Sequence, residues 1–534
     1  MAHRFMHGSP LLMGNATVPG VPMTKELREL IPTILEACRK FGLDFYPTVV
    51  QMLTYDEISE IAAYGGFPVR YPHWRWGMEY EELQRGYEYG MHKIYEMVIN
   101  TNPCYIYCLN SNSILDHITV IAHATGHNHF FKNNIYFAPT SQNMMNELAN
   151  HGSRIRRYMA RWGKEKVTEF IDHLIRIDTL IDPALAWQMR KVKDPVVKDT
   201  RKYLQPRRLK VDSDRSYMEP YVHPKEWTEY EHKRIEKKEA AQELGIFEEP
   251  TKNIFGFIKD CAPLKPWQAD IMSMIYEEAL YFAPQRMDHM LNEGFASWVD
   301  YNIMSKQGFV GLGQKEYDCG IFEYAAHKMG VLGGRYSMNP YKLGFYMLED
   351  IEERWNKGQF GSEWDECKDI RVKEKWDKKL GLGKEKVFEV TKYYDDVTAI
   401  TEFFTQDFCD KYEFFEWKHY PNGEYRIEDR DHKKIKQKLL QMKVNGGLPD
   451  IRLTDPNHRG KGQFFLQHYW NGRMLYDPYV RETLTSIRYL IGNDVFLATR
   501  DSDGDEVVYC CRGSDPEKGV EIVSRSTYQR GWNG

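Results

Sequence analysis

Apolar residues recur at helical intervals along most of the first 380 residues of the chain. Residues three and four positions apart share one face of an α-helix, so such a repeat marks a helix that buries one side. The repeat is clearest in residues 24–42, 113–134, 141–157 and 266–304, where Thr24 and Ser113 are expected N-caps and Pro284 an expected break. The pattern predicts a large, mainly α-helical domain, which we place at residues 24–380.

The pattern changes after about Gly381. Short runs of β-branched and aromatic residues alternate there with Asn-Gly, Gly-Asn and Asp-Gly pairs, which favour tight turns between strands. We therefore expect a smaller α+β domain over residues 381–534. The whole protein is expected to be mainly α, and α+β overall.

Two stretches lack the pattern of a buried face. Residues 1–23 are rich in glycine and proline, which predicts a flexible N-terminal arm. Residues 190–250 carry dense charges of both signs, which is typical of a solvated linker or extension within the helical domain.

Composition narrows the class of protein. A chain of 534 residues is expected to hold more than one domain. The net charge of −5, with basic and acidic residues interspersed, argues against nucleic-acid binding. No run approaches the roughly 18 apolar residues of a membrane span, and no secretion signal opens the chain, so we expect a cytoplasmic protein. Nine scattered cysteines without a C-x2-C motif predict reduced thiols and no structural zinc ribbon.

Two pairs of ionisable residues stand out in the segment 121–157. His123 and His127 are four residues apart, as are Glu147 and His151. This interval places both members of a pair on one face of a helix, about one turn apart, where they can hold a metal ion. One such pair is a weak motif, because chance produces it in a chain of this size. The second pair nearby strengthens the interpretation.

A later segment supplies further acids. Glu293 and Asp300 share one helical face with the small residues Ala296 and Ser297 between them, which leaves room for a group to approach. The pattern therefore predicts a metal site. Its four expected ligands are His123, His127, Glu293 and Asp300. The alternative is that these groups form a buried hydrogen-bonded network that orders the core.

Cationic side chains elsewhere are candidates for substrate binding. His73 and Arg75 belong to an aromatic and cationic cluster that either packs as a structural knot or faces a substrate. Lys132 follows the histidine pair, and Arg154 follows the second pair. Both could hold an anionic group, although arginines in such places commonly pair with surface acids.

Several longer motifs resemble those of one family. The chain contains AAYGGFPVRYPHWRWGMEYE, HATGH, MMNELANH, NEGFASW and NPYKLG. Together they resemble the stage V sporulation protein R family from about Leu43 to the C-terminal region. The resemblance implies a role in spore cortex formation or stress physiology. It also implies two partners, a serine-kinase-like AAA protein and a protein with a von Willebrand-like domain. The family pattern has a histidine where this chain has Asp300, which shifts the ligand set toward oxygen.

HATGH also resembles the zincin motif H-E-x-x-H, with Ala124 in place of the glutamate, and NEGFASW resembles the gluzincin helix that supplies a third ligand. The resemblance implies a gluzincin-like core in which zinc or another divalent metal is held with one open position. Because the usual base is missing, either Glu147 or His151 replaces it, or the site is not hydrolytic. A bundle-like core with two metals between both pairs, Glu293 and Asp300 is the other arrangement.

Two functions follow from these observations. The first is a metal-dependent hydrolase that acts on an amide, in peptidoglycan or its precursors. The second is a non-enzymatic regulatory or scaffold protein that acts with the kinase-like partner. Ala124 favours the second, and the zincin-like ligand set favours the first.

Overall fold

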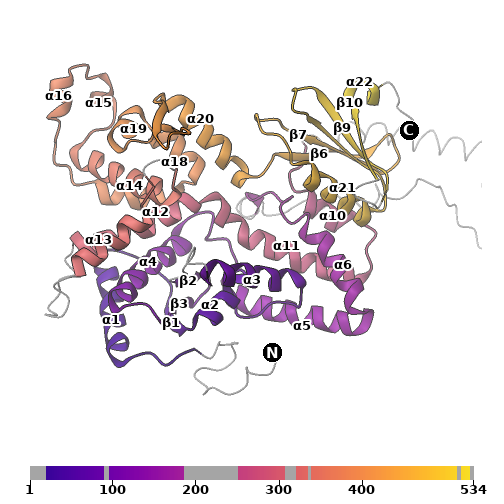
Figure 1. The fold of residues 1–534 in the computed structure, drawn as a ribbon, viewed down its shortest axis with the longest axis horizontal. Coiled ribbons are helices and arrows are strands. Elements are labelled where there is room, and N and C mark those ends of the chain that lie inside the picture. Colours follow the sequence, from indigo (N-terminus) through magenta and orange to yellow (C-terminus); the bar gives the residue numbers. More distant parts are fainter. Residues whose placement is uncertain are drawn as a thin grey trace, which may run out of the picture. The chain divides into compact units, whose positions relative to one another are not determined.

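The computed structural model describes residues 20–88, 96–185, 250–306, 320–334, 338–513 and 519–529. These residues form two compact units, coloured along the chain in Figure 1. Unit 1 takes its residues from 1–168, 183–192 and 280–447, and unit 2 from 169–182, 193–279 and 448–534. The predicted N-terminal arm and charged linker lie outside the described residues, except for residues 20–23 and residue 250. The predicted limit at residue 380 falls inside unit 1, and the predicted domain limits stay a prediction.

Unit 1 is mainly helical, and its helices enclose one large apolar core. The described helices that lie entirely in unit 1 are α1 (Lys25–Lys40), α2 (Tyr55–Ala63), α3 (Trp74–Glu88), α4 (Ile114–Asn133), α5 (Met144–Trp162), α12 (His289–Tyr301), α13 (Gly320–Val331), α14 (Pro340–Lys357), α15 (Ser362–Glu366), α16 (Ile370–Glu374), α17 (Gly383–Tyr393), α18 (Asp396–Phe403), α19 (Gln406–Tyr412) and α20 (His432–Lys443). A π-helical turn, Asn302–Lys306, follows α12. Unit 1 continues past residue 380 because α17 and α18 bury Val387, Val390 and Ile400 in this same core.

A small sheet supports the helices of unit 1. Its strand order is β1 (Thr48–Leu53), β3 (Cys104–Leu109) and β2 (Glu96–Ile99), with β1 parallel and β2 antiparallel to β3. All six residues of the central strand β3 are buried, as expected for a strand covered on both faces. The edge strand β2 packs against α4, which brings Glu96 beside that helix. A hairpin of β4 (Glu416–His419) and β5 (Tyr425–Asp429) lies near the end of the unit.

Helices α4 and α12 cross closely at the centre of unit 1. α4 begins at Ser113, whose hydroxyl accepts from the backbone N–H of Asp116. A Cβ added at Gly126 of α4 would lie 2.9 Å from the Cα of Ala296 on α12. The two backbones can therefore approach only because both residues are small. This crossing fixes the distance between the side chains of the two helices.

On its other side, α12 meets α14 at an even closer crossing. A Cβ on Gly294 would lie 2.4 Å from the carbonyl carbon of Gly344 and 2.8 Å from the backbone nitrogen of Phe345. Gly294→Ala is therefore expected to lower the free energy of unfolding by about 3 kcal/mol, the upper end of the overpacking range. Urea denaturation of the purified protein measures this change.

Gly330→Ala is the matched control for that substitution. Gly330 is in α13, and within the part of the chain that the structure describes no atom lies within 4 Å of the Cβ that alanine would add. This variant is expected to be more stable than the wild type by about 0.5–1 kcal/mol, because alanine has the higher helix propensity. Equal stability of the Gly294→Ala variant and the wild type would contradict the close crossing of α12 and α14.

Unit 2 combines a five-stranded sheet with helices. The strand order is β10 (Val520–Ser524), β9 (Glu506–Cys511), β8 (Val495–Arg500), β7 (Gln463–His468) and β6 (Ile451–His458), and only the β7–β8 pair is parallel. The unit also contains α10 (Ile254–Cys261), α21 (Asp477–Ile491) and α22 (Arg525–Gln529), while α6 (Lys164–Ile175) and α11 (Pro266–Met287) cross the sequence limits of the units. The prediction of a mainly α protein that is α+β overall is confirmed.

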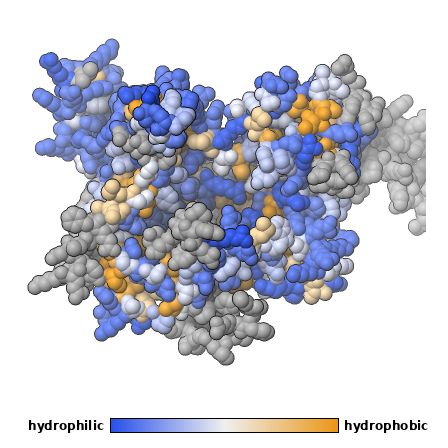
Figure 2. Space-filling model, viewed as in Figure 1, coloured by the Kyte–Doolittle hydropathy of each residue, from blue (hydrophilic) through white to orange (hydrophobic). Residues whose placement is uncertain are grey.

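The expected helix break at Pro284 is wrong, because α11 continues to Met287 and α12 begins at His289. Proline removes one backbone donor, and the helix tolerates that loss for one more turn before it ends. The surface drawn in Figure 2 is mainly hydrophilic, with apolar residues in small groups. Within the part of the chain that the structure describes, no helix is long and apolar enough to cross a membrane.

Candidate metal centre

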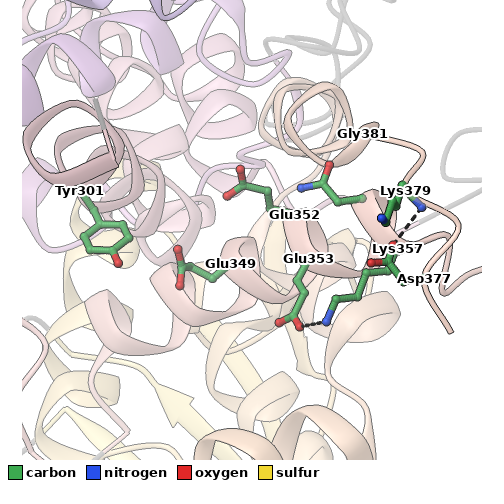
Figure 3. A pocket seen from close by; sticks show the side chains of 9 residues that line it. Tyr301, Glu349, Glu352, Glu353, Lys357, Asp377, Lys379 and Gly381 are labelled. Carbon is green, nitrogen blue, oxygen red and sulfur yellow. Dashed lines mark hydrogen bonds and ion pairs between the residues drawn. The ribbon is translucent and has the colours of Figure 1, made fainter. Parts of the chain in front are cut away.

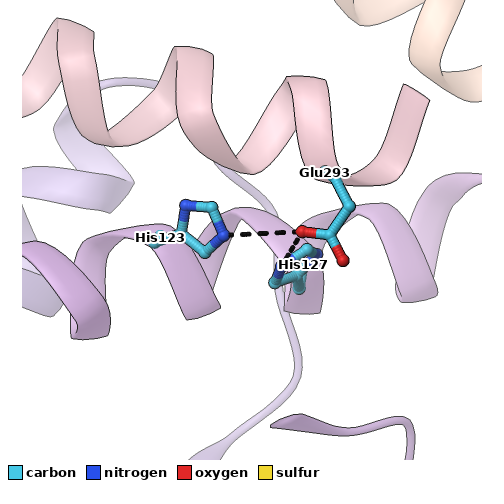
Figure 4. Close-up of side chains that lie close together, drawn as sticks. All are labelled: His123, His127 and Glu293. Atoms are coloured by element: carbon cyan, nitrogen blue, oxygen red, sulfur yellow. Dashed lines mark ion pairs between the residues drawn. The ribbon is translucent and has the colours of Figure 1, made fainter. Parts of the chain in front are cut away.

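The imidazoles of His123 and His127 converge on one carboxylate. Both residues are on α4, and Glu293 faces them from α12, as Figure 4 shows. Glu293 Oε2 is 3.7 Å from His123 Nε2 and 3.3 Å from His127 Nε2. Among the described residues, these three form a group whose ligand atoms all lie within 4.8 Å of one another. We call this group the triad.

The far nitrogens of both rings are held by residues of α12. His123 Nδ1 lies 2.9 Å from Asp300 Oδ2, and His127 Nδ1 lies 2.9 Å from Asn292 Oδ1. Because these oxygens accept hydrogen bonds, each Nδ1 carries a proton and donates. This arrangement directs the Nε2 atoms of both rings toward Glu293. Such support by a carboxylate or amide is what orients histidine ligands in metal sites.

Asp300 is itself fixed by two residues of α13. The hydroxyl of Tyr324 donates to Asp300 Oδ1 at 2.7 Å, and Lys328 Nζ lies 2.9 Å from the same oxygen. Lys328 Nζ also donates to the backbone carbonyl of Ser297 at 2.9 Å. Asp300 was predicted as a direct ligand, but the structure places it on the opposite nitrogen of His123, outside the triad.

His123 and Glu293 shift the pKa of one another in opposite directions. Burial by itself lowers the pKa of His123, but its hydrogen bond with Asp300 and the nearby carboxylate of Glu293 outweigh burial and raise that pKa to about 10. For Glu293, burial raises the pKa, and the two histidines more than reverse that effect and hold it well below its usual range. The triad without a metal therefore contains a protonated His123 beside an ionised Glu293.

Two further residues beside the triad were not predicted. Burial raises the pKa of Glu96 on β2, which interacts electrostatically with His123, His127 and Glu293. The phenol of Tyr341, near the start of α14, interacts electrostatically with Glu293, and burial followed by that carboxylate raises the pKa of the phenol. The signal for Glu96 was a single acid next to the apolar run Met97–Ile99, and Tyr341 stands in the motif NPYKLG.

The donor set fits a divalent metal such as zinc. Two imidazole nitrogens and one carboxylate oxygen are typical zinc ligands, at about 2.0–2.2 Å from the ion. In a tetrahedron with such bonds, neighbouring ligand atoms are about 3.3–3.6 Å apart. The observed separations of 3.3 and 3.7 Å from Glu293 are close to that edge length. All three ligand atoms lie within 4.8 Å of one another, so His123, His127 and Glu293 can hold the ion once their side chains move closer together.

Glu147 and His151, the predicted catalytic pair, are not part of the triad. Both are on α5, whose buried residues Met144 and Leu148 pack into a second apolar cluster. Glu147 Oε1 accepts from the Ser141 hydroxyl at 2.8 Å, and His151 is buried. Their spacing along one helix is as predicted, but that helix presents them to other neighbours.

Three of the predicted substrate-binding residues make contacts with residues other than those of the triad. His73 is in ring contact with Tyr71 and Trp76, as expected for an aromatic knot. Arg75 pairs with Glu79 at 2.7 Å. Lys132 forms an ion pair with Asp44. Arg154 is half-buried on α5. The roles of these four residues in substrate binding stay predictions.

A larger pocket of about 570 Å³ is present in unit 1, and Figure 3 shows its lining. Acidic side chains from α14 dominate it, but several have partners. Glu353 pairs with Lys357 at 2.5 Å, and Glu352 accepts from the indole of Trp298 at 3.0 Å. No residue of the triad lines this pocket, so we place the candidate chemistry at the triad.

Comparison with known proteins places the chain in a family. The family model described as SpoVR like protein matches residues 22–448, which is most of the chain. The chain belongs to the SpoVR family. This SpoVR-family chain is also 26% identical over 488 residues to the uncharacterized protein YcgB of Escherichia coli (strain K12), covering 87% of this chain and 90% of that protein. No solved structure matches. The resemblance inferred from the motifs is confirmed.

Proposed function

We propose that this SpoVR-family protein binds a divalent metal ion, zinc by its donor set, and hydrolyses an amide bond at that site. The observation that carries the proposal is the orientation of both imidazoles. Asp300 and Asn292 hold each Nδ1, so both Nε2 atoms face Glu293. A purely structural network would not need two rings aimed at one carboxylate oxygen with their outer nitrogens already satisfied.

The residues around the triad fit a hydrolytic role. A divalent metal held there supplies a Lewis acid for the substrate carbonyl. Ala124 stands where zincins carry their base, so we assign the base to Glu96, which approaches from β2. Its carboxylate takes a proton from the attacking water and returns it to the leaving amine. The Tyr341 phenol beside Glu293 is placed to donate a hydrogen bond to the substrate.

The wider biological setting is also part of the proposal. The family resemblance supports an amide in peptidoglycan or its precursors as substrate, in spore cortex formation or stress physiology. It also supports a cytoplasmic location and the kinase-like AAA and von Willebrand-like partners. These assignments rest on the family, whereas the reaction class rests on the residues of the triad.

A second function is supported by the charge balance of the buried group. The anions Glu293 and Asp300 face the cations His123 and Lys328, so the network is neutral without a metal. Together with Ala124, this balance favours a regulatory or scaffold protein whose core the network orders. Metal analysis separates the two functions.

The full-length protein, supplied with zinc and then dialysed, is expected to retain about one metal ion per chain. The variant His123→Ala/His127→Ala is expected to retain almost none, because two of three ligands are lost. Plasma mass spectrometry of the purified proteins measures both values.

His129→Ala is the matched control. His129 is on the same helix and equally buried, but its Nδ1 accepts from the backbone N–H of Asp44 and it is outside the triad. This variant should keep its metal. A wild-type protein that binds no divalent metal at micromolar concentrations would refute the hydrolase and leave the scaffold function.

A further inference from the structure

A small cavity lies one helical turn beyond the triad. Phe131 lines it, and this ring is stacked with the imidazole of His127 at 6.2 Å between ring centroids. Val98 lines it from β2, two residues after Glu96 and therefore on the same face of that strand. Helix α4, which carries both histidines of the triad, and strand β2, which carries Glu96, therefore each contribute a residue to the wall of the cavity.

The cavity is small and mostly aromatic. Its volume is about 50 Å³. One water-sized group needs roughly 10–15 Å³ of such space, so the cavity holds about three to five groups of that size. The rings of Phe67, Phe137 and Phe282 form much of its wall. A side chain of serine, threonine or valine size fits this space, whereas a phenylalanine side chain is too large.

One polar atom in the wall has no hydrogen-bond partner among the residues that the structure describes. Asn100 lines the cavity and is 6% exposed, and its Oδ1 atom is buried without a hydrogen bond. The orientation of this amide is fixed, because Asn100 Nδ2 donates to Thr140 Oγ1 at 2.8 Å. The Thr140 hydroxyl cannot donate in return, since it already donates to the Phe137 carbonyl at 2.6 Å. Asn100 Oδ1 is therefore a buried acceptor that can receive a hydrogen bond from a bound group.

We propose that this cavity is the specificity pocket of the triad and takes a hydroxyl-bearing side chain of serine or threonine size. The substrate is then an amide whose acyl residue, next to the bond that is cut, carries such a side chain. The hydroxyl donates to Asn100 Oδ1, and the carbon atoms contact the aromatic wall. This inference rests on the proposed function, because it uses the metal centre to place the substrate carbonyl.

The test measures binding of hydroxamates to the zinc-loaded, full-length protein by calorimetry. Acetohydroxamate reports on the metal centre alone, and the hydroxamates of N-acetyl-threonine, N-acetyl-valine and N-acetyl-phenylalanine add side chains. The threonine compound is expected to bind about five- to tenfold more tightly than its isostere valine, which leaves the Asn100 oxygen unpaired. The phenylalanine compound is expected to bind no more tightly than acetohydroxamate.

Asn100→Ala removes the acceptor and should abolish the preference for threonine over valine without changing the affinity for acetohydroxamate. If this variant does not fold, the comparison of threonine with valine in the wild type still decides. If the threonine and valine compounds bind the wild type equally tightly, and acetohydroxamate also binds it, the pocket is refuted and the metal centre is not. Absence of acetohydroxamate binding to the zinc-loaded protein would instead overturn the metal centre, and the pocket with it.

Discussion

Zinc affinity is expected to rise about tenfold for each pH unit between pH 7 and pH 9. The metal-free protein holds a proton on His123, whose pKa is raised to about 10 by its hydrogen bond with Asp300 and by the nearby carboxylate of Glu293. A metal ion needs the Nε2 lone pair and must displace that proton, so the affinity falls as the pH falls. Competition with a chelator of known pH dependence measures the slope.

Stability of the metal-free protein is expected to change in the opposite direction. The pKa of His123 is raised from 6.5 in the unfolded chain to about 10 in the fold. Its contribution to stability is therefore fully present below pH 6.5 and is lost as the pH rises through about 10. The melting temperature without zinc should fall over this range, while the increase caused by zinc should grow.

Asp300→Asn is the control variant for both measurements. Asparagine keeps the shape but removes a charge that raises the pKa of His123. The slope of zinc affinity against pH should flatten near neutral pH in this variant. A wild-type affinity that does not change between pH 7 and pH 9 would show that His123 holds no proton in the metal-free protein.

Local features of this chain were predictable because they depend on neighbours in sequence. Thr24 and Ser113 cap their helices as expected. The four-residue interval placed His123 and His127 on one face of α4, and this prediction needed no knowledge of the rest of the fold. Almost every side chain of α4 is buried, so its apolar residues predicted a helix but not which side faces the site, and the spacing of its histidines indicated the site.

Features that depend on distant contacts were harder to predict. Glu147 and His151 have the same spacing as the histidine pair, but spacing does not reveal which helix faces another, and α5 packs elsewhere. Asp300 lies on the predicted face of α12, yet it meets the outer nitrogen of His123. Glu96 was missed because its position depends on the pairing of β2 with β3 and on the packing of that strand against α4.

Substitution of Glu96 is expected to have the second large effect. Glu96→Gln should reduce the rate of amide hydrolysis by about 10²- to 10⁴-fold, which is the usual contribution of a general base. Glutamine has nearly the same size but cannot take a proton from water. Because Glu96 is outside the triad, the variant should still bind zinc. Initial rates are measured with a fluorogenic peptide selected from a library cleaved by the zinc-loaded wild type.

Glu147→Gln makes the comparison decisive, because the sequence alone suggested this residue as the base. Its carboxylate accepts from the Ser141 hydroxyl and takes no part in the triad, so the rate should stay within about twofold of the wild type. Bound zinc is measured in both variants to exclude loss of the metal as the cause. If Glu147→Gln loses the activity and Glu96→Gln keeps it, the base belongs to α5. Neither glutamate belongs to the triad, so a loss of activity in either variant that still binds zinc is a loss of proton transfer and not of the metal.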